Sequence, residues 1–452
     1  MPRPIEALRV DEIAHHAGAW RAIWRMSWPS VLAAWLKSSF MLADTLCAGH
    51  LSTTALAGMS AAVVLVWMFH SLSQVNSLGS ISLVAQSVGA GSPEQMRAVF
   101  RRAVSLAPVL GLVASSLMGI AGPAALRWMA LPPDVYEEAR AYLLTIAISG
   151  VGMWVLDTLE QSFRGTGDAR TPLLVTATFA SLNLLLNPLL AFGVGSFPGF
   201  GLVGIAIASG VAWFGGASVL LVIAWRRGWF TPSSSLPPDP LQLWRVGAPT
   251  AAAGIAFDLI WVTLLPLLSA TGPAALAAVA VGHRLESLSY QMSAGIGMAC
   301  AALVGQAWGM GRPDLARMLA ARCSLAGFVL SSTWIGALLL AAPAVIPLFG
   351  DDDDLLRNGL DYLALVGLPS ILQGVELIVT GAFSGTGRTL LPSVVMLVSY
   401  GARVPLARLG AAAFGAAGVF AAIGTTAGLS GLFVCIAFLL FGARRHRPLE
   451  GV

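Results

Sequence analysis

The fold of this chain is decided near its start, by residues 29–51, which read PSVLAAWLKSSFMLADTLCAGHL. Lys37 and Asp44 interrupt a run that is otherwise apolar and long enough to cross a bilayer. They are 7 positions apart (44 − 37), so they share one face of a helix roughly 10 Å apart along its axis. A charge at membrane depth costs about 3 kcal/mol on insertion scales, and chains keep one mainly where it lines a cavity or meets a partner. We therefore interpret Asp44 as a functional group, with an ion pair to Lys37 as the alternative.

Composition places the chain in a membrane. Of its 452 residues, 57% are hydrophobic and 11% are charged, whereas a soluble domain carries about 25% charged residues. The formal net charge of +4 is small and scattered, so we expect no nucleic-acid partner. The four cysteines show no paired spacing and predict neither a disulfide framework nor a metal site. We expect no cofactor.

Apolar runs of helical length predict twelve membrane spans. They fall at residues 26–48, 54–80, 103–122, 141–163, 171–195, 200–225, 243–268, 275–303, 320–347, 360–384, 391–415 and 416–441. Arginines gather in alternate loops, as at Arg226 and Arg227 after the sixth span, whereas the loop at 351–354 is acidic. The positive-inside rule then predicts that both termini are cytoplasmic, and we expect a multi-pass protein of the bacterial inner membrane.

An internal repeat divides the spans into two halves. Pro29 pairs with Pro249 at an offset of 220 (249 − 29), and the same offset recurs along some 140 residues. The further matching pairs are Gln86 and Gln306, Gly89 and Gly309, Pro93 and Pro313, Arg97 and Arg317, Tyr142 and Tyr362, Gly165 and Gly385, and Pro172 and Pro392. Six spans per half is an even number, so both halves share one membrane orientation, and a substrate path is expected between them near the midplane.

The repeat and the loops predict the domain organisation. We expect a cytoplasmic or interfacial amphipathic segment at 1–25 and a first six-helix lobe at 26–226. A Pro- and Ser-rich cytoplasmic linker follows at 227–242, then a second six-helix lobe at 243–441 and a cytoplasmic tail at 442–452.

Several motifs, taken in order, resemble those of multidrug and toxic-compound extrusion (MATE) transporters. They include Asp44-Thr45 with Gly49-His50-Leu51, Phe163-Arg-Gly-Thr-Gly-Asp168, Asn183 with Asn187-Pro188, and Arg403-Val-Pro405-Leu-Ala407. The resemblance covers nearly everything from Pro29 to Leu440. It implies an all-α integral membrane protein with twelve transmembrane helices in two pseudo-symmetric six-helix lobes that form a V. It also implies export of amphipathic, often cationic compounds by alternating access against a sodium or proton gradient.

The first lobe holds the leading candidate site. Reckoned from topology, Asp44, Asn183, Asn187 and Ser209 all lie in the outer half of the bilayer and could converge on one small ion. The resemblance maps them onto the family's coordinating positions, but Asn187 stands for an Asp and Ser209 for a Thr. One carboxylate is then left, with Lys37 nearby, which disfavours sodium at Asp44, Asn183 and Asn187 and favours a proton on Asp44. The alternative is that the two asparagines only make interhelical hydrogen bonds.

The second lobe holds a possible acidic site. Asp258, Glu286 and Glu376 lie in the seventh, eighth and tenth spans, where the resemblance implies cation or proton binding. Arg403 in the eleventh span is the expected buried partner of one of these acids, which would make that acid structural.

Other polar residues of the spans are candidates for lining the cavity. The cavity candidates are Lys37, His70, Gln74 and Arg403. His70 and Gln74 share a face of the second span, although a lone membrane histidine commonly just hydrogen-bonds a neighbour. Asp157 and Glu160 form an acidic pair in the fourth span. Glu160 is interpreted as structural because a charge near the cytoplasmic end can snorkel to water.

These features favour a secondary-active exporter, expected to act as a monomer on small molecules, most of all organic cations, and not as an enzyme. A rival is a flippase of lipid-linked sugars, whose cavity should be ringed by arginines to hold a diphosphate. The charged residues expected to face the cavity lean acidic instead, with Asp44, Asp258, Glu286 and Glu376 against Lys37, Arg284 and Arg403. An intramembrane enzyme using Asp44, His70 or Ser209 is less favoured, because no catalytic arrangement of these residues recurs at a useful spacing.

Overall fold

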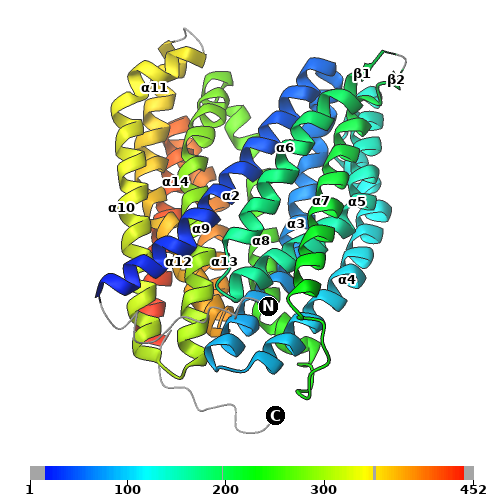
Figure 1. Ribbon diagram of the computed structural model, residues 1–452. Helices are drawn as coiled ribbons and strands as arrows, with labels where there is room; N and C mark the ends of the chain where they lie inside the picture. The colour runs from blue at the N-terminus through cyan, green and yellow to red at the C-terminus, as the bar shows by residue number, and fades with distance from the viewer. Residues whose placement is uncertain (1–15, 196, 350–352, 442–452) are drawn as a thin grey trace. The chain divides into compact units, whose positions relative to one another are not determined.

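A computed structural model describes residues 16–195, 197–349 and 353–441, and nearly all of them are helical. The elements of the first half are α2 (His16–Leu51), α3 (Thr53–Gly89), α4 (Pro93–Trp128), α5 (Pro133–Gly165), α6 (Arg170–Phe192), the short hairpin β1 (Gly193–Val194) and β2 (Phe197–Pro198), and α7 (Gly201–Arg226) (Figure 1). The second half comprises α8 (Pro240–Ala270), α9 (Pro273–Gly309), α10 (Pro313–Val345), η1 (Ile346–Phe349), α11 (Asp353–Tyr362), η2 (Leu363–Gly367), α12 (Leu368–Thr386), α13 (Leu390–Gly401) and α14 (Arg403–Phe441). Most of the predicted amphipathic segment, residues 1–15, and the predicted tail at 442–452 lie outside the described residues.

Two backbone turns recur at the repeat offset. Gly91 and Gly311 follow α3 and α9 with φ of 68° and 70°, and 311 − 91 is 220. Gly167 and Gly387 follow α5 and α12 with φ of 90° and 76°, and 387 − 167 is again 220. Positive φ is cheap only for glycine, so each turn fixes where a helix ends. The repeat found in the sequence is therefore also a repeat of backbone conformation.

Eleven helical segments among the described residues are long and apolar enough to cross a membrane. The last of them, Leu390–Leu440, has 51 residues and is interrupted at Gly415, where φ is 60° and ψ is −135°. A Cβ placed on Gly410 would lie 2.4 Å from the carbonyl oxygen of Gly418, whereas a straight helix separates residues eight apart by about 12 Å. The chain thus reverses at Gly415, and this segment supplies the two arms predicted at 391–415 and 416–441.

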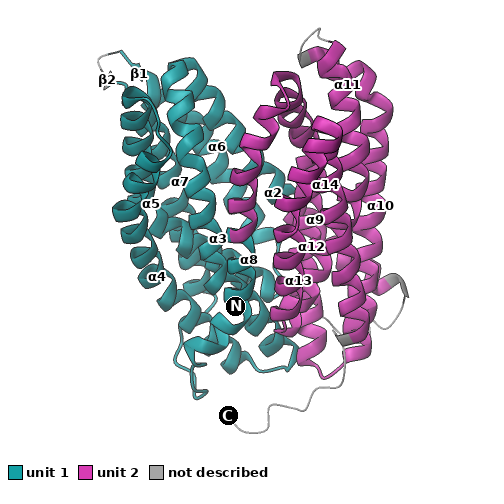
Figure 2. Cartoon of the chain, turned by 180° about the vertical axis from the view of Figure 1, so that it is seen from behind, with its two compact units in different colours: residues 1–8, 32–255 teal, residues 9–31, 256–452 magenta. Residues whose placement is uncertain are grey.

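The described chain forms two compact units, drawn in different colours in Figure 2. Unit 1 comprises residues 32–255, and unit 2 comprises the described parts of 9–31 and 256–452. Helices α2 and α8 therefore each contribute residues to both units. The predicted lobes were defined by the order of spans and the units by packing, so the predicted domain boundaries stay predictions.

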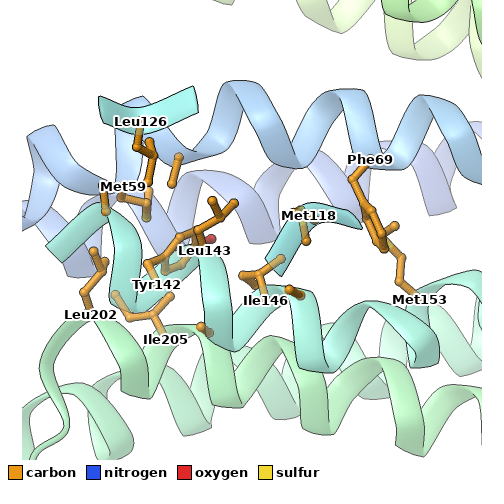
Figure 3. Packing of buried hydrophobic residues seen from close by; sticks show 14 of the residues in the cluster. Met59, Phe69, Met118, Leu126, Tyr142, Leu143, Ile146, Met153, Leu202 and Ile205 are labelled. Carbon is orange, nitrogen blue, oxygen red and sulfur yellow. The ribbon is translucent and has the colours of Figure 1, made fainter. Parts of the chain in front are cut away.

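The two units share one packing scheme. In unit 1, α5 packs against α3, α4 and α7, and α6 packs against α7. In unit 2, α12 packs in the same way against α9, α10 and α14, and α13 packs against α14. The core of unit 1 places Tyr142, Leu143 and Ile146 of α5 against Met59 and Phe69 of α3 and apolar residues of α4 and α7 (Figure 3). Each unit thus has its own close-packed core, the main source of helix association in lipid.

The first part of the predicted linker is packed onto the end of unit 1. Arg227 Nη1 donates a 2.8 Å hydrogen bond to Asp168 Oδ2, and its guanidinium lies 5.1 Å from the centre of the Phe163 ring. Buried Trp229 contacts Phe163 and Phe100, with ring centres 4.5 and 4.9 Å apart. The Pro- and Ser-rich composition did not predict this docking, because aromatic stacking between residues of different helices is a tertiary contact.

The first prediction concerns Asp168. Partial burial acts to raise the pKa of this carboxyl, but hydrogen bonds from Thr171 and Arg227 outweigh it, so the pKa lies below the ordinary 3.8. A lowered pKa means that the ionised group stabilises the fold above pH 3.8 and that this stability is lost as the pH falls below it. Asp168→Asn should therefore cost about 1–2 kcal/mol at pH 7, a difference that shrinks in acid.

Thermal unfolding of the purified protein against pH measures this difference. Asp314→Asn is the control, because Asp314 pairs with Arg312 while 64% exposed, and such surface pairs contribute little. Equal effects of the two substitutions at pH 7, or a pH-independent effect of Asp168→Asn, would contradict the prediction.

Candidate functional site

Four side chains from three helices meet inside unit 1. Asn187 Nδ2 of α6 donates to Asp44 Oδ1 of α2 at 2.5 Å, and Ser209 Oγ of α7 donates to Asp44 Oδ2 at 3.5 Å. Asn183 Nδ2 donates to Ser209 Oγ at 3.4 Å, and Asn187 Nδ2 also reaches Asn183 Oδ1 at 2.9 Å. We name Asp44, Asn183, Asn187 and Ser209 the outer cluster. The structure thus brings together the four residues that the sequence singled out, and their role in coupling stays a prediction.

The outer cluster is buried and carries one formal charge. Asp44 is 6% exposed, Ser209 is 2% exposed, and both asparagines are fully buried. Asn183 and Asn187 face the cluster because they are four residues apart on α6, while Leu184 and Leu185 on the other side of that helix are exposed. In the described part of the chain, the hydrogen-bond donors to the Asp44 carboxylate, Asn187 and Ser209, are neutral. The carboxylate is therefore the group of this cluster that can gain and lose a proton.

Lys37 pairs with acids of α5 rather than with Asp44. Its Nζ lies 2.8 Å from Glu160 Oε2 and 3.6 Å from Asp157 Oδ1. Arg164 Nη2 lies 3.2 Å from the same Glu160 oxygen, and Thr176 Oγ1 donates to Glu160 Oε1 at 3.0 Å. We name Lys37, Asp157, Glu160, Arg164 and Thr176 the inner network. Two cations and two carboxylates balance one another within it.

The inner network corrects the interpretation of Glu160. This residue was expected to snorkel toward water, yet it is 1% exposed and Arg164 is 2% exposed. The expectation was wrong because Lys37, from a helix distant in sequence, supplies a positive charge that compensates the buried carboxylate of Glu160. The spacing of Glu160 and Arg164, four residues apart on one helix, was the available signal for part of this network.

Two basic side chains form the accessible edge of the inner network. The side chains of Lys37 and His70 are 43% and 47% exposed, against 13% for Asp157. His70 Nδ1 lies 3.5 Å from Asp157 Oδ2, which also accepts a 2.9 Å hydrogen bond from Ser73 Oγ. Gln74, one turn beyond His70, is half-buried. An exposed ammonium within a membrane span is tolerated where it meets water or a partner rather than lipid.

Unit 2 holds two carboxylates that are each bonded by a tyrosine. Tyr362 Oη donates to Glu286 Oε2 at 2.9 Å, and Tyr400 Oη donates to Glu376 Oε2 at 2.9 Å. Ser430 Oγ donates to the other oxygen of Glu376 at 2.5 Å. The two tyrosines and Ser430 were missed from sequence, because hydroxyls in apolar spans carry no pattern that points to a carboxylate. Sequence alone had named only the two acids.

Arg403 is buried beside these acids, but not as expected. It is 1% exposed, its Nε donates to Thr426 Oγ1 at 2.8 Å, and its guanidinium lies 4.6 Å from the centre of the Tyr400 ring. Among the described residues no ion pair joins it to Glu286 or Glu376. The predicted ion pair between Arg403 and one of these acids was therefore wrong. The ring of Tyr400, and not a carboxylate, packs against the guanidinium.

The third acid of unit 2, Asp258, is half-buried on α8. Within the described ranges no three His, Cys, Asp or Glu side chains gather closely enough to hold a metal ion. Glu286 and Glu376 are thus each held by hydroxyl hydrogen bonds, and the role of the three acids stays a prediction.

A multi-span helical protein with two like-packed units and buried carboxylates has the features of a tandem-repeat membrane transporter. The MatE family model matches residues 29–189 and again residues 249–409. Both ends of the two matches differ by 220 (249 − 29 and 409 − 189), the offset of the internal repeat. The matches cover more than half of the chain, so it belongs to the MatE family of multidrug and toxic-compound extrusion transporters.

Relatives and solved structures match most of the chain. A probable multidrug resistance protein NorM of Thermotoga maritima is 28% identical over 381 residues, which cover 82% of this chain and 81% of that protein. An FAD transporter of Shewanella oneidensis is 25% identical over 421 residues, covering 91% and 92%. A crystal structure of a MATE protein in the straight conformation has a TM-score of 0.87 at 18% identity, covering 97% of this chain and 98% of the other. The structural likeness shows the all-α membrane fold.

The second prediction tests the inner network. Glu160→Gln should lower the free energy of unfolding by about 3 kcal/mol or more, because it leaves the buried guanidinium of Arg164 without its paired carboxylate. The measurement is thermal unfolding in detergent.

Glu137→Gln serves as the control, since Glu137 pairs with Arg140 on the surface with its own side chain 66% exposed, and its loss should be nearly neutral. If the two substitutions cost the same, the inner network does not carry the stability assigned to it.

Proposed function

We propose that this protein is a secondary-active exporter that moves amphipathic small molecules, above all organic cations, out of the cell in exchange for protons. The membership of the family and the multidrug-resistance relative support efflux. The single observation that carries the coupling proposal is the outer cluster, in which one buried carboxylate, Asp44, is surrounded by neutral donors.

A proton suits the outer cluster better than sodium does. A proton neutralises Asp44 with no further ligand, whereas a dehydrated metal cation needs several oxygens and net negative charge. Asn187 directs its Nδ2 group at the carboxylate, and its amide oxygen is neutral, so Asp44 supplies the one negative charge of the cluster. Burying an unpaired charge is costly, so protonation and deprotonation of Asp44 should change the free energy of unit 1 strongly. That change is the proposed link to alternating access, with both termini on the cytoplasmic side.

Different groups of the molecule favour opposite signs for the charge of the substrate. The acids Asp258, Glu286 and Glu376 of unit 2 favour cations. The accessible edge of the inner network is basic, through Lys37 and His70, and the relative from Shewanella oneidensis transports FAD. An anionic amphiphile is therefore the second candidate, favoured by the exposure of Lys37.

The flippase alternative gains no support from the arginines. A diphosphate is held by accessible guanidinium groups. Arg164 and Arg403 are 2% and 1% exposed and are already engaged, one with Glu160 and the other with Thr426 and Tyr400. Neither is free to ring a cavity with positive charge. We therefore keep the exporter as the proposed function.

The third prediction is the transport test of this proposal. Proteoliposomes containing the wild type should accumulate a fluorescent organic cation under a proton gradient. Asp44→Asn should reduce uptake to the level of protein-free liposomes, because the amide cannot exchange a proton. A sodium gradient alone should drive no uptake.

Asp134→Asn is the matched control, because Asp134 is an exposed carboxylate at the start of α5 and should leave uptake unchanged. A fluorescent anion of similar size, assayed alongside, separates the two substrate charges. Sodium-driven uptake would overturn proton coupling, and uptake that survives in Asp44→Asn would remove Asp44 from the coupling site.

A further inference from the structure

The buried charges of unit 2 do not balance in the way those of the inner network do. The spans of unit 2 hold Asp258, Glu286 and Glu376, besides Asp353, Asp354 and Asp361 at the start of the segment Asp353–Thr386. Among the described residues of unit 2, Arg403 is the buried cation. Glu286 and Glu376 are 8% and 1% exposed, whereas Arg284, which is near Glu286 in sequence, is exposed. Arg403 is therefore the fixed positive charge available to the two buried glutamates.

Both glutamates are arranged as acceptors. Glu376 accepts a hydroxyl hydrogen bond on each of its oxygens, from Tyr400 and from Ser430, and Glu286 accepts one from Tyr362. An ionised carboxylate accepts on both oxygens, while a protonated one must donate through one of them. The hydrogen bonds to both oxygens of Glu376 fit an ionised carboxylate, and an ionised carboxylate needs positive charge nearby to remain buried.

Arg403 supplies that charge to both glutamates without binding either. Its guanidinium interacts electrostatically with Glu286 and Glu376 alike, and it is held in place by Thr426 and by the faces of Tyr400 and Phe257. Its Nη2 atom is buried and has no hydrogen-bond partner among the described residues. Because Arg403 is held by a hydroxyl and by aromatic rings, its positive charge is not paired with any single carboxylate.

The internal repeat relates Arg403 to a residue of the candidate ion site in unit 1. At the offset of 220, Arg403 corresponds to Asn183 of the outer cluster (403 − 183). Where unit 1 has a neutral amide in its candidate ion site, unit 2 thus has a permanent cation. Arginine cannot lose its proton in a protein, so this charge is present in every state of the transporter.

We propose that Arg403 is a specificity-determining residue, a resident cation whose fixed charge takes the place that a monovalent metal ion would otherwise fill beside Glu286 and Glu376. Unit 2 consequently needs no sodium or potassium to keep its acids buried. Removal of the arginine charge creates a cation requirement that the natural protein lacks. The proposal concerns binding and stability, so it stands or falls independently of proton coupling at Asp44.

Thermal unfolding in three salts tests the proposal. Proteins carrying Asp44→Asn, which silences the candidate ion site of unit 1, are unfolded in NaCl, KCl or choline chloride at equal ionic strength. This background protein should unfold at one temperature in all three salts. With Arg403→Met added, the midpoint in choline should fall by several degrees and recover in NaCl or KCl, because a bound ion stabilises the folded state.

Two further variants separate charge from packing. Arg403→Lys keeps the charge and should remain indifferent to the salt. Arg403→Met combined with Glu376→Gln removes one buried carboxylate as well, and should lose most of the salt response and regain stability. A salt response of the background protein itself, or none in Arg403→Met, would overturn the proposal. If neither the Met variant nor its combination with Glu376→Gln folds, Arg403 acts through its Thr426 and aromatic contacts, and the proposal is wrong.

Discussion

The structure depends on one constraint, that a charge placed inside a membrane span must be compensated by groups of the same compact unit. Glu160 meets it with two cations, Lys37 from α2 and Arg164 from its own helix. Breaking such a pair costs several kcal/mol, because the partner is left buried and charged. The inner network therefore holds α2, α5 and α6 in one arrangement, and it shares α2 and α6 with the candidate ion site.

Asp44 is the exception within unit 1, and that makes it the group most able to respond. Its partners are amides and a hydroxyl, which stabilise a carboxylate less than an ammonium or guanidinium does. A charge held so weakly can be removed by a proton at modest cost, whereas Glu160 cannot give up its charge without stranding two cations. The two acids are therefore proposed to differ in role, because their partners differ.

The repeat conserves the backbone more closely than the chemistry. The turns at Gly91 and Gly311 have nearly the same φ, but the position equivalent to Asp44 in unit 2 is Leu264 (264 − 44 is 220), which is fully buried in the apolar core. Tyr142 packs in the core of unit 1, while its counterpart Tyr362 bonds Glu286. Close packing restricts where helices turn, but many side chains satisfy one packed position, so the two units can hold different sites on one framework.

The sequence by itself determined the membrane class, the helical spans and the repeat, because hydropathy and recurring motifs can be read along the chain. It singled out the four residues of the outer cluster through their depth in the predicted spans and through the family resemblance. The tertiary structure decided which charges meet. Lys37 turned to Glu160 rather than Asp44, Arg403 stacked on Tyr400 instead of pairing with an acid, and Arg227 fastened the linker to Asp168. Each of these contacts joins different helices, and their geometry is set by how the helices pack, which no pattern along one segment records.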